Sequence, residues 1–140
     1  MQKNALEKLE ILRQKKQTKA LIIAATGSGK TYLSAFDVKN FKAKKMLFLV
    51  HRENILISAK QSFENIIPNK TFGLFTGNKK EKNKDYIFST IQTMSLYFEE
   101  FEKNEFDYII IDEAHHVTSP TYKKVIEYFK PKFLLCLTAT

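Results

Sequence analysis

The chain contains short, nearly continuous apolar runs separated by segments with the spacing of amphipathic helices. Runs without apolar–polar alternation are typical of strands buried on both faces of a parallel sheet. The runs are residues 20–25, 46–50, 72–75, 86–88, 108–111 and 133–137. The helical faces between them are Ala5, Leu9 and Leu12; Ile55, Ala59 and Phe63; and Tyr122, Val125, Ile126 and Phe129. This alternation predicts an α/β domain, with a mainly parallel sheet and helices on both faces.

Length and composition fit one globular domain over residues 1–140, with 44% hydrophobic and 27% charged residues. The longest apolar stretch is six residues, 20–25, far short of the about 20 that a membrane-spanning helix needs. The single cysteine, Cys136, lies in an apolar run, which indicates a buried thiol. We therefore expect a cytoplasmic protein without disulfides and without a membrane contact.

Turn and helix-start residues divide the predicted elements. Residues 78–85 form the one strongly polar run and predict a solvated loop between two strands. Thr118-Ser119-Pro120 predicts a capped helix start with proline in the first helical position. We find no internal repeat and no linker that would separate two domains.

A phosphate-binding loop follows the first apolar run. The sequence Ala24-Ala25-Thr26-Gly27-Ser28-Gly29-Lys30-Thr31 precedes a predicted helix at 32–41. Gly27 and Gly29 allow the backbone N–H groups of Thr26, Ser28 and their neighbours to point at phosphate oxygens at a helix N-terminus. Lys30 can reach the β- and γ-phosphates, and the Thr31 hydroxyl can hold Mg²⁺. Ala24 replaces the first glycine of the usual pattern; the competing interpretation is a Gly-Ser turn beside a surface lysine.

Two adjacent acids end the apolar run at 108–111. In nucleotide hydrolases with a phosphate loop, an acid in this position holds the metal, and we assign that role to Asp112. We assign Glu113 the deprotonation of the attacking water. Side chains of adjacent residues diverge at a strand end, which suits two separate roles.

The sequence Asp112-Glu113-Ala114-His115 is a DEAH box, and with the phosphate loop it resembles the first RecA-like domain of superfamily 2 helicases and translocases. Further matches occur in the family's order: Gln2 ahead of the loop, 48–56 as motif Ia, 75–77, 88–94 as motif Ib, and 137–140 as motif III. The form of motif Ia and the run 111–116 are most similar to helicase subunits of type I and type III restriction enzymes and related DNA helicases. DEAH-type RNA helicases share the box and remain an alternative.

The resemblance implies a site for ATP and Mg²⁺ and roles for individual residues. Gln2 would read adenine, and His115 would couple the nucleotide site to Thr138 and Thr140. The resemblance also implies that Arg52, Thr76, Gly77, Ser89 and Thr90 lie along a nucleic-acid backbone, DNA rather than RNA. Contacts of this kind carry no base identity. For Ser89 and Thr90 the competing interpretation is capping of a helix at 91–98.

Charge adds two expectations. The net charge of +8 lies entirely in residues 1–45, so we attribute it to the nucleotide-binding third more than to a nucleic-acid footprint. Only Arg13 and Arg52 accompany 21 lysines, and neither is a candidate arginine finger. Family members take that finger from a second RecA-like domain. Because these 140 residues hold one domain, we expect weak nucleotide binding and poor turnover from them alone. A non-motor phosphate-loop NTPase and a module that merely binds ATP remain alternatives.

Overall fold

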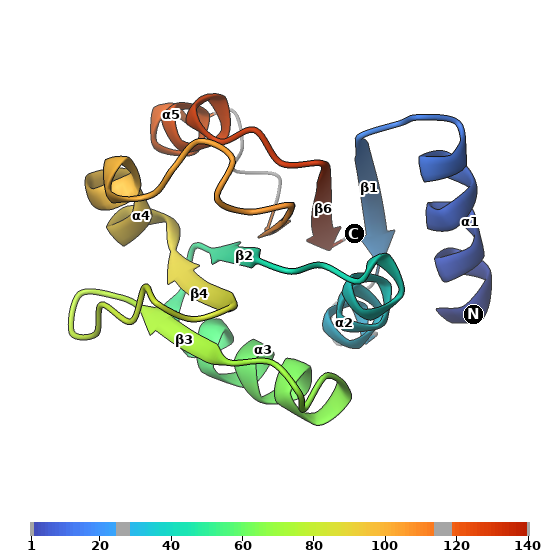
Figure 1. Ribbon diagram of the computed structural model, residues 1–140, viewed down its shortest axis with the longest axis horizontal. Coiled ribbons are helices and arrows are strands. Elements are labelled where there is room, and N and C mark those ends of the chain that lie inside the picture. The colour runs from blue at the N-terminus through green and yellow to red at the C-terminus, as the bar shows by residue number, and fades with distance from the viewer. Residues whose placement is uncertain (1, 25–28, 114–118, 140) are drawn as a thin grey trace.

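The computed structural model describes residues 2–24, 29–113 and 119–139. Strands and helices alternate along the chain, as the apolar pattern predicts (Figure 1). The strands are β1 (Lys19–Ala24), β2 (Met46–Val50), β3 (Phe72–Phe75), β4 (Tyr86–Thr90), β5 (Tyr108–Asp112) and β6 (Phe133–Ala139). The α-helices are α1 (Gln2–Gln14), α2 (Lys30–Phe41), α3 (Glu53–Ile66), α4 (Ile91–Tyr97) and α5 (Pro120–Tyr128). A short 3₁₀-helix, Phe98–Glu100, follows α4.

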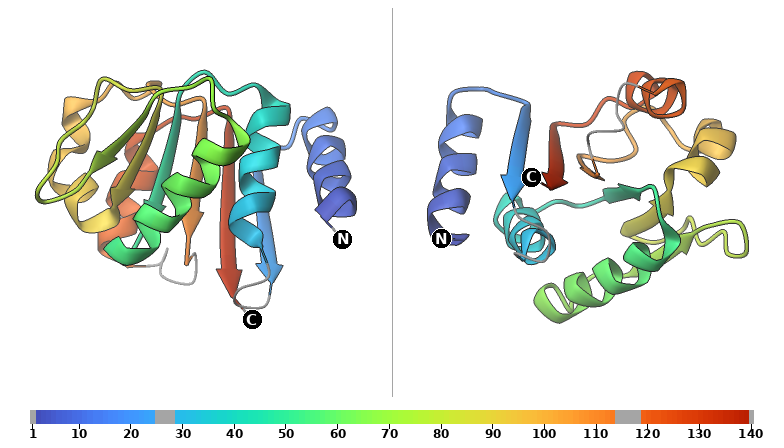
Figure 2. Two further views of the ribbon diagram at one scale, coloured as in Figure 1. Left: turned by 90° about the horizontal axis from the view of Figure 1, so that it is seen from below. Right: turned by 180° about the vertical axis from the view of Figure 1, so that it is seen from behind.

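The six strands form one sheet in the order β1-β6-β5-β2-β4-β3, and every pairing within it is parallel. Parallel pairing brings the carboxyl ends of all strands to one side of the sheet and the amino ends to the other; we call these the carboxyl edge and the amino edge. In Figure 2 (left) the arrowheads of β1, β5 and β6 point to the same side. The fold prediction of a parallel α/β sheet is confirmed.

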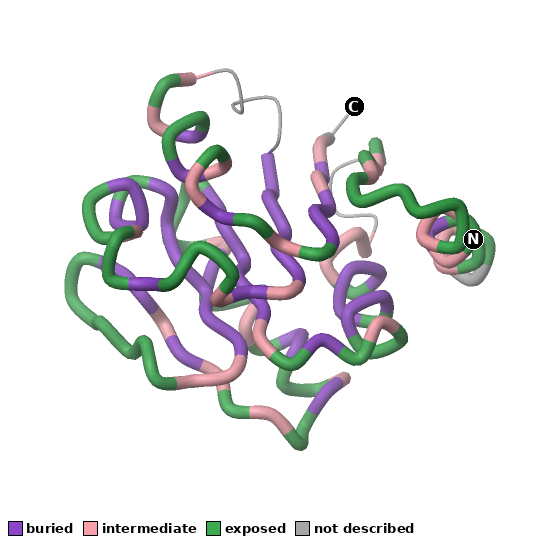
Figure 3. Tube along the Cα trace, turned by 45° about the horizontal axis from the view of Figure 1, so that its top comes forward, coloured by how far each residue is buried: buried purple, intermediate pink, exposed green. Residues whose placement is uncertain are grey.

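Helices cover both faces of the sheet. Helices α2 and α3 lie on one face, α4 and α5 lie on the other, and α1 lies beyond β1 (Figure 2). Strands β2, β4 and β5 are buried along their whole length, and they run through the buried interior in Figure 3. On the α3 face, the rings of Phe48, Phe63 and Phe88 have centroids within 5.3–5.7 Å of one another. These central strands match the expectation of burial on both faces.

Strand β1 departs from that expectation. Leu21 is 58% exposed and Ile23 is 60% exposed, although the run resembles a buried strand in sequence. The reason is position: β1 is the terminal strand of the sheet, and α4 and α5 cover the half that contains β2, β4 and β5. Cys136, which pairs in register with Leu21, is correspondingly half-buried rather than fully enclosed. Burial still raises the pKa of its thiol.

Local signals place several boundaries correctly. Ser119 accepts a hydrogen bond from the Tyr122 N–H at the start of α5, and Pro120 is the first helical residue. Residues 78–85 form an exposed connection between β3 and β4. No helix in the described part of the chain has the length and apolar character needed to cross a membrane.

A buried carboxylate in α2 joins three elements, and the sequence gives no hint of it. Asp37 is completely buried and accepts hydrogen bonds from both terminal nitrogens of Arg13, at 2.7 and 2.8 Å. It also accepts one from the Tyr108 hydroxyl at 2.5 Å. The Arg13 guanidinium in turn lies over the rings of Phe41 and Phe133. This network fixes α1 to α2 and to the start of β5.

Removing Arg13 should therefore destabilise the domain far more than removing a surface arginine. Arg13→Ala leaves a buried, unpaired carboxylate, and breaking a buried pair in this way costs about 3–5 kcal/mol. Arg52→Ala, which removes a largely exposed side chain, is the matched control and should cost under about 1 kcal/mol. Urea unfolding of both variants measures the difference; equal losses would show that the network does not stabilise the fold.

Gly29 is the residue before α2 and has φ 81°, in the left-handed region that favours glycine. Gly29→Ala should cost about 1–2 kcal/mol in the free energy of unfolding, the penalty of left-handed backbone for a residue with a Cβ. Gly77 has open space where a Cβ would be built and no positive φ, so Gly77→Ala should be neutral or slightly stabilising. Thermal unfolding compares the two; a Gly29→Ala protein as stable as Gly77→Ala would contradict the strain.

Candidate functional site

The predicted site residues gather along the carboxyl edge, and the strand order divides them into two groups. Strands β1, β6 and β5 lead to the phosphate loop, motif III and the acidic pair. Strands β2, β4 and β3 lead to Arg52, Thr90 and Thr76. Ligands bind at this edge in open parallel sheets because loops and helix N-termini converge there. The expected nucleotide half and nucleic-acid half are therefore neighbours, which meet between β5 and β2.

Lys30 and Asp112 lie together in the nucleotide half. The Lys30 ammonium is 3.0 Å from Asp112 Oδ1, and both side chains are mostly buried, at 15% and 3% exposed. Lys30 is the first residue of α2, whose N-terminus carries the positive end of the helix dipole. Thr31 follows on the same helical turn and is half-buried, and its carbonyl accepts a hydrogen bond from the Ser34 hydroxyl. The Thr31 hydroxyl and the Asp112 carboxylate are hard oxygen ligands, which suit Mg²⁺.

Glu113 adopts an unusual backbone conformation directly after β5. Its φ is 60°, in the left-handed region, and its N–H donates to Asp112 Oδ1 at 2.8 Å. Left-handed backbone in a residue with a side chain costs about 1–3 kcal/mol and is common at functional sites. The turn separates the two carboxylates, so that Asp112 faces Lys30 while Glu113 faces β2. Two neighbouring acids thus acquire different partners, and the two separate roles assigned to them stay predictions.

Arg52 is the partner of Glu113. Its Nη2 lies 3.0 Å from Glu113 Oε2, although the two residues belong to different motifs. The Arg52 side chain is 63% exposed, while the Glu113 side chain is 11% exposed. The other carboxylate oxygen, Glu113 Oε1, is buried and has no hydrogen-bond partner among the described residues. An orphaned buried carboxylate oxygen is costly, and a water molecule would satisfy it.

Tyr122 of α5 forms the wall behind the two acids. Burial raises the pKa of its hydroxyl strongly, and the negative charges of Glu113 and Asp112 raise it further. Tyr122 therefore stays neutral and presents a hydroxyl and an apolar ring at the acidic pair. Tyr122 belongs to the apolar face that the sequence predicts for its helix, and it is buried there at 1% exposure.

The residues predicted to contact nucleic acid differ in burial and in hydrogen bonding. Thr90 caps α4, accepting from the Thr93 N–H, while the fully buried Ser89 donates its hydroxyl to the Thr90 carbonyl. Both hydroxyls thus bond within the chain, as the capping interpretation expects for Thr90. Thr76 is also buried, and its hydroxyl accepts from the backbone N–H groups that follow it. Gly77 and Arg52 are exposed at this edge.

The remaining predicted site residues are only partly described. Thr26, Gly27, Ser28, His115 and Thr140 lie outside the described residues, so their assigned roles stay predictions. For Gln2 the backbone is described as the first residue of α1, and the side chain is not. Thr138 lies in β6, paired in register with Ile23.

One site contact was not predicted from the sequence: the Arg52–Glu113 ion pair. Sixty-one positions separate its partners, and they meet because β2 and β5 are adjacent in the sheet. No sequence pattern carries that pairing. The described residues contain no cluster of three or more histidine, cysteine or carboxylate side chains suited to a metal ion.

Comparisons with known proteins agree with this geometry. The profile of the family described as "Type III restriction enzyme, res subunit" matches residues 1–140. Among curated relatives, IRC3 of Saccharomyces cerevisiae, named as an ATP-dependent helicase, is 29% identical over 117 residues, which are 76% of this chain and 17% of that protein. The irc3 protein of Schizosaccharomyces pombe, named as a mitochondrial ATP-dependent helicase, is 31% identical over 113 residues, 75% of this chain and 18% of that protein. The chain thus spans about a fifth of the length of these relatives.

Solved structures share the fold. The SWI2/SNF2 ATPase core of Sulfolobus solfataricus, in complex with dsDNA, superposes with a TM-score of 0.80 at 21% identity, over 99% of this chain and 31% of that one. The type ISP restriction-modification enzyme LlaGI, as a nuclease-deletion mutant with a DNA substrate mimic, gives 0.76 at 22% identity, over 99% and 17%. The match over residues 1–140 shows that the chain belongs to the type III restriction enzyme res subunit family, and it has the RecA-like α/β fold that these solved structures share.

Proposed function

We propose that this domain binds ATP with Mg²⁺ and hydrolyses it in response to nucleic acid, as one half of a motor that moves on DNA. The observation that carries the proposal is the continuous line of charged contacts Lys30–Asp112 and Glu113–Arg52 along the carboxyl edge. These contacts connect Lys30, the predicted phosphate-binding residue, to Arg52, the residue predicted to contact a nucleic-acid backbone, through the two acids. A non-motor NTPase has no need for the second contact.

The nucleotide half is arranged to receive phosphates and a divalent ion. The Lys30 ammonium, now on Asp112, can turn to the β- and γ-phosphates when a nucleotide binds. Asp112 and Thr31 would then hold Mg²⁺, which neutralises charge on the phosphates. Glu113 Oε1 is the buried acceptor available to orient a water molecule and take its proton.

Arg52 gives the domain a way to respond to nucleic acid. While Arg52 holds Glu113 Oε2, the ion pair restrains the orientation of the Glu113 carboxylate. An ion pair with one exposed partner is worth only about 0–1 kcal/mol, so a phosphate of a nucleic-acid backbone can recruit Arg52 at small cost. Release of Arg52 leaves Glu113 free to act on water. Nucleic-acid binding and hydrolysis are thereby coupled through one side chain.

Turnover by these 140 residues should nevertheless be low. Arg13 is committed to Asp37 and Arg52 to Glu113, so neither arginine of the chain is placed to reach a γ-phosphate. Loss of an arginine finger lowers the rate by about 10³–10⁵. A second RecA-like domain is the expected source of that group.

Replacements of Lys30, Asp112 and Glu113 test the nucleotide site. Lys30→Ala and Asp112→Asn should weaken Mg-dependent binding of a fluorescent ATP analogue at least about tenfold, because each removes a charge that meets the phosphates or the ion. Glu113→Gln should retain binding and lose hydrolysis, and wild-type turnover should stay below about one per second. Faster turnover stimulated by DNA would disprove the need for a second domain, and a Glu113→Gln protein with unchanged hydrolysis would disprove the assignment of the base.

Replacement of Arg52 tests the coupling. Arg52→Ala should leave hydrolysis without nucleic acid unchanged or higher, since the restraint on Glu113 is gone, and should abolish stimulation by DNA. Lys60→Ala, within α3 and paired with Glu64, is the control and should keep the stimulation. ATPase assays with duplex DNA, single-stranded DNA and RNA measure the effect and rank the substrates. Normal stimulation of the Arg52→Ala protein would rule out this coupling.

A further inference from the structure

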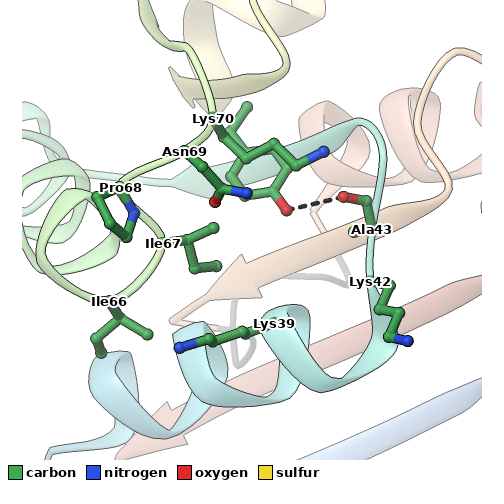
Figure 4. A pocket seen from close by; sticks show the side chains of 9 residues that line it. Lys39, Lys42, Ala43, Ile66, Ile67, Pro68, Asn69 and Lys70 are labelled. Atoms are coloured by element: carbon green, nitrogen blue, oxygen red, sulfur yellow. Dashed lines mark hydrogen bonds between the residues drawn. The ribbon is translucent and has the colours of Figure 1, made fainter.

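The amino edge of the sheet, opposite the proposed ATP site, gathers lysines from separate parts of the chain. Two hollows lie there. One has a volume of about 340 Å³ and is formed by the ends of α2 and α3 and the start of β4 (Figure 4). The other, of about 380 Å³, is formed by the segments that lead into β2, β5 and β6. Seven lysines line them: Lys39, Lys42 and Lys70 in the first, and Lys44, Lys45, Lys130 and Lys132 in the second.

We propose that these seven lysines form a second nucleic-acid contact, which binds the phosphate backbone of a duplex without regard to sequence. The two hollows are lined by consecutive residues of one segment, 42 and 43 in the first and 44 and 45 in the second. Four neighbouring strands, β4, β2, β5 and β6, begin beneath them. Neighbouring strands are about 4.8 Å apart, so the lysines are spread over roughly 15 Å. That width matches an extended polyanion better than a single small anion.

Few carboxylates oppose this charge. No carboxylate lines the first hollow, and the second contains only Glu105 and Asp107. Glu105 is paired with Lys45, and both Asp107 oxygens accept backbone N–H groups, those of Lys44 and Lys45. Among the residues that the structure describes, the other six lysines form no ion pair. Hydrogen bonds from Thr71 lower the pKa of Asp85, directly before β4, and the nearby charges of Lys70 and Lys45 lower it further. The positive charge of the remaining five lysines is available to an external anion: Lys39, Lys42, Lys44, Lys130 and Lys132.

Stabilisation of helix ends explains only part of the cluster. Lys39 lies in the last turn of α2 and Lys42 is its C-cap, where positive charge offsets the helix dipole. Lys44, Lys70 and Lys132 lie outside any helix, in the segments leading into strands. Their shared location follows from the parallel sheet, which brings the starts of all strands to one edge. The cluster thus exceeds what the helix ends require.

The residue types favour a duplex backbone. Flexible ammonium groups act as point charges and suit a phosphate backbone that carries charge at regular intervals. The aromatic rings at these hollows, Tyr86 and Phe106, are 1% exposed, and Tyr86 donates its hydroxyl to the Ala43 carbonyl. A single strand is bound by stacking its bases on exposed rings, and these rings are not accessible for stacking. A duplex contacted through its phosphates needs no ring.

Charge reversal in both hollows tests this surface. Lys39→Glu combined with Lys132→Glu changes one exposed lysine in each hollow. The control, Lys8→Glu with Lys123→Glu, makes the same change in charge at exposed positions of α1 and α5. Anisotropy of a labelled DNA duplex is measured on the 140-residue chain between about 50 and 200 mM salt. The edge variant should bind at least tenfold more weakly, with a salt slope smaller by about 2 or more, while the control changes less than about threefold.

Further measurements distinguish failure of this proposal from failure of the proposed function, and a duplex from an acidic protein. Arg52→Glu should retain the edge-dependent binding, because Arg52 lies at the opposite edge. If Arg52→Glu abolishes all duplex binding, the second contact is disproved and the proposed function survives. Equal losses in the edge and control variants would also disprove it, since net charge would then explain binding. Binding of polyglutamate with the same lysine dependence, and no binding of duplex, would replace nucleic acid by an acidic protein.

Protection of lysines from acetylation gives a readout independent of affinity. With duplex present, Lys39, Lys44 and Lys132 should be acetylated more slowly than Lys8 and Lys123, as measured by mass spectrometry. Thermal unfolding of each variant confirms that the fold is retained. Equal acetylation of all five lysines with and without duplex would contradict the proposal.

Discussion

The parallel pairing of the strands is the constraint on which the rest of this structure depends. Because every neighbouring pair runs in the same direction, each strand must begin at one edge and end at the other. The helices carry the chain back, so the helices that follow a strand start at the carboxyl edge. Helix N–H groups and the predicted site residues therefore lie at the carboxyl edge. The lysine-rich segments that connect each helix to the next strand lie at the amino edge.

Strand order then decides which functional residues meet. Asp112 ends β5 and Glu113 follows it, and β5 lies between β6 on the proposed nucleotide side and β2 on the proposed nucleic-acid side. The left-handed turn at Glu113 directs one acid to each side, toward Lys30 and toward Arg52. A different order of the same strands would keep every motif and lose the contact between the halves. The contact between the two halves follows from the adjacency of β5 and β2 in the sheet.

Stability and function draw on different charged groups. Arg13 and Asp37 form a mostly buried pair that holds α1 against α2, and the partly exposed Glu10 of α1 also contacts Arg13. Arg52 and Glu113 form a pair in which Arg52 is largely exposed, so solvent and external anions have access to Arg52. The two arginines of the chain thus have opposite environments, and burial is what separates a structural pair from an exchangeable one. Because Arg13 contacts Asp37 and Arg52 contacts Glu113, neither arginine is placed to contact a γ-phosphate.

The sequence by itself determined the class of fold and most of the strands, because apolar runs bounded by polar segments admit few alternatives. It also predicted that Lys30 and the acidic pair belong to one site, because both are local motifs, and the structure brings Lys30 and Asp112 into contact. It predicted burial of β1 wrongly, because an apolar run does not reveal whether its strand is central or terminal.

Only the tertiary structure decided which distant residues lie together. Asp37 gives no signal in the sequence, because its partners Arg13 and Tyr108 are 24 and 71 positions away. The basic excess of residues 1–45 was attributed to the nucleotide-binding third, yet Lys39, Lys42, Lys44 and Lys45 lie at the opposite edge beside Lys70 and Lys132. The position of a charge in the sequence does not show where it lies in space, because a parallel sheet places a residue at one edge or the other according to whether it precedes or follows a strand.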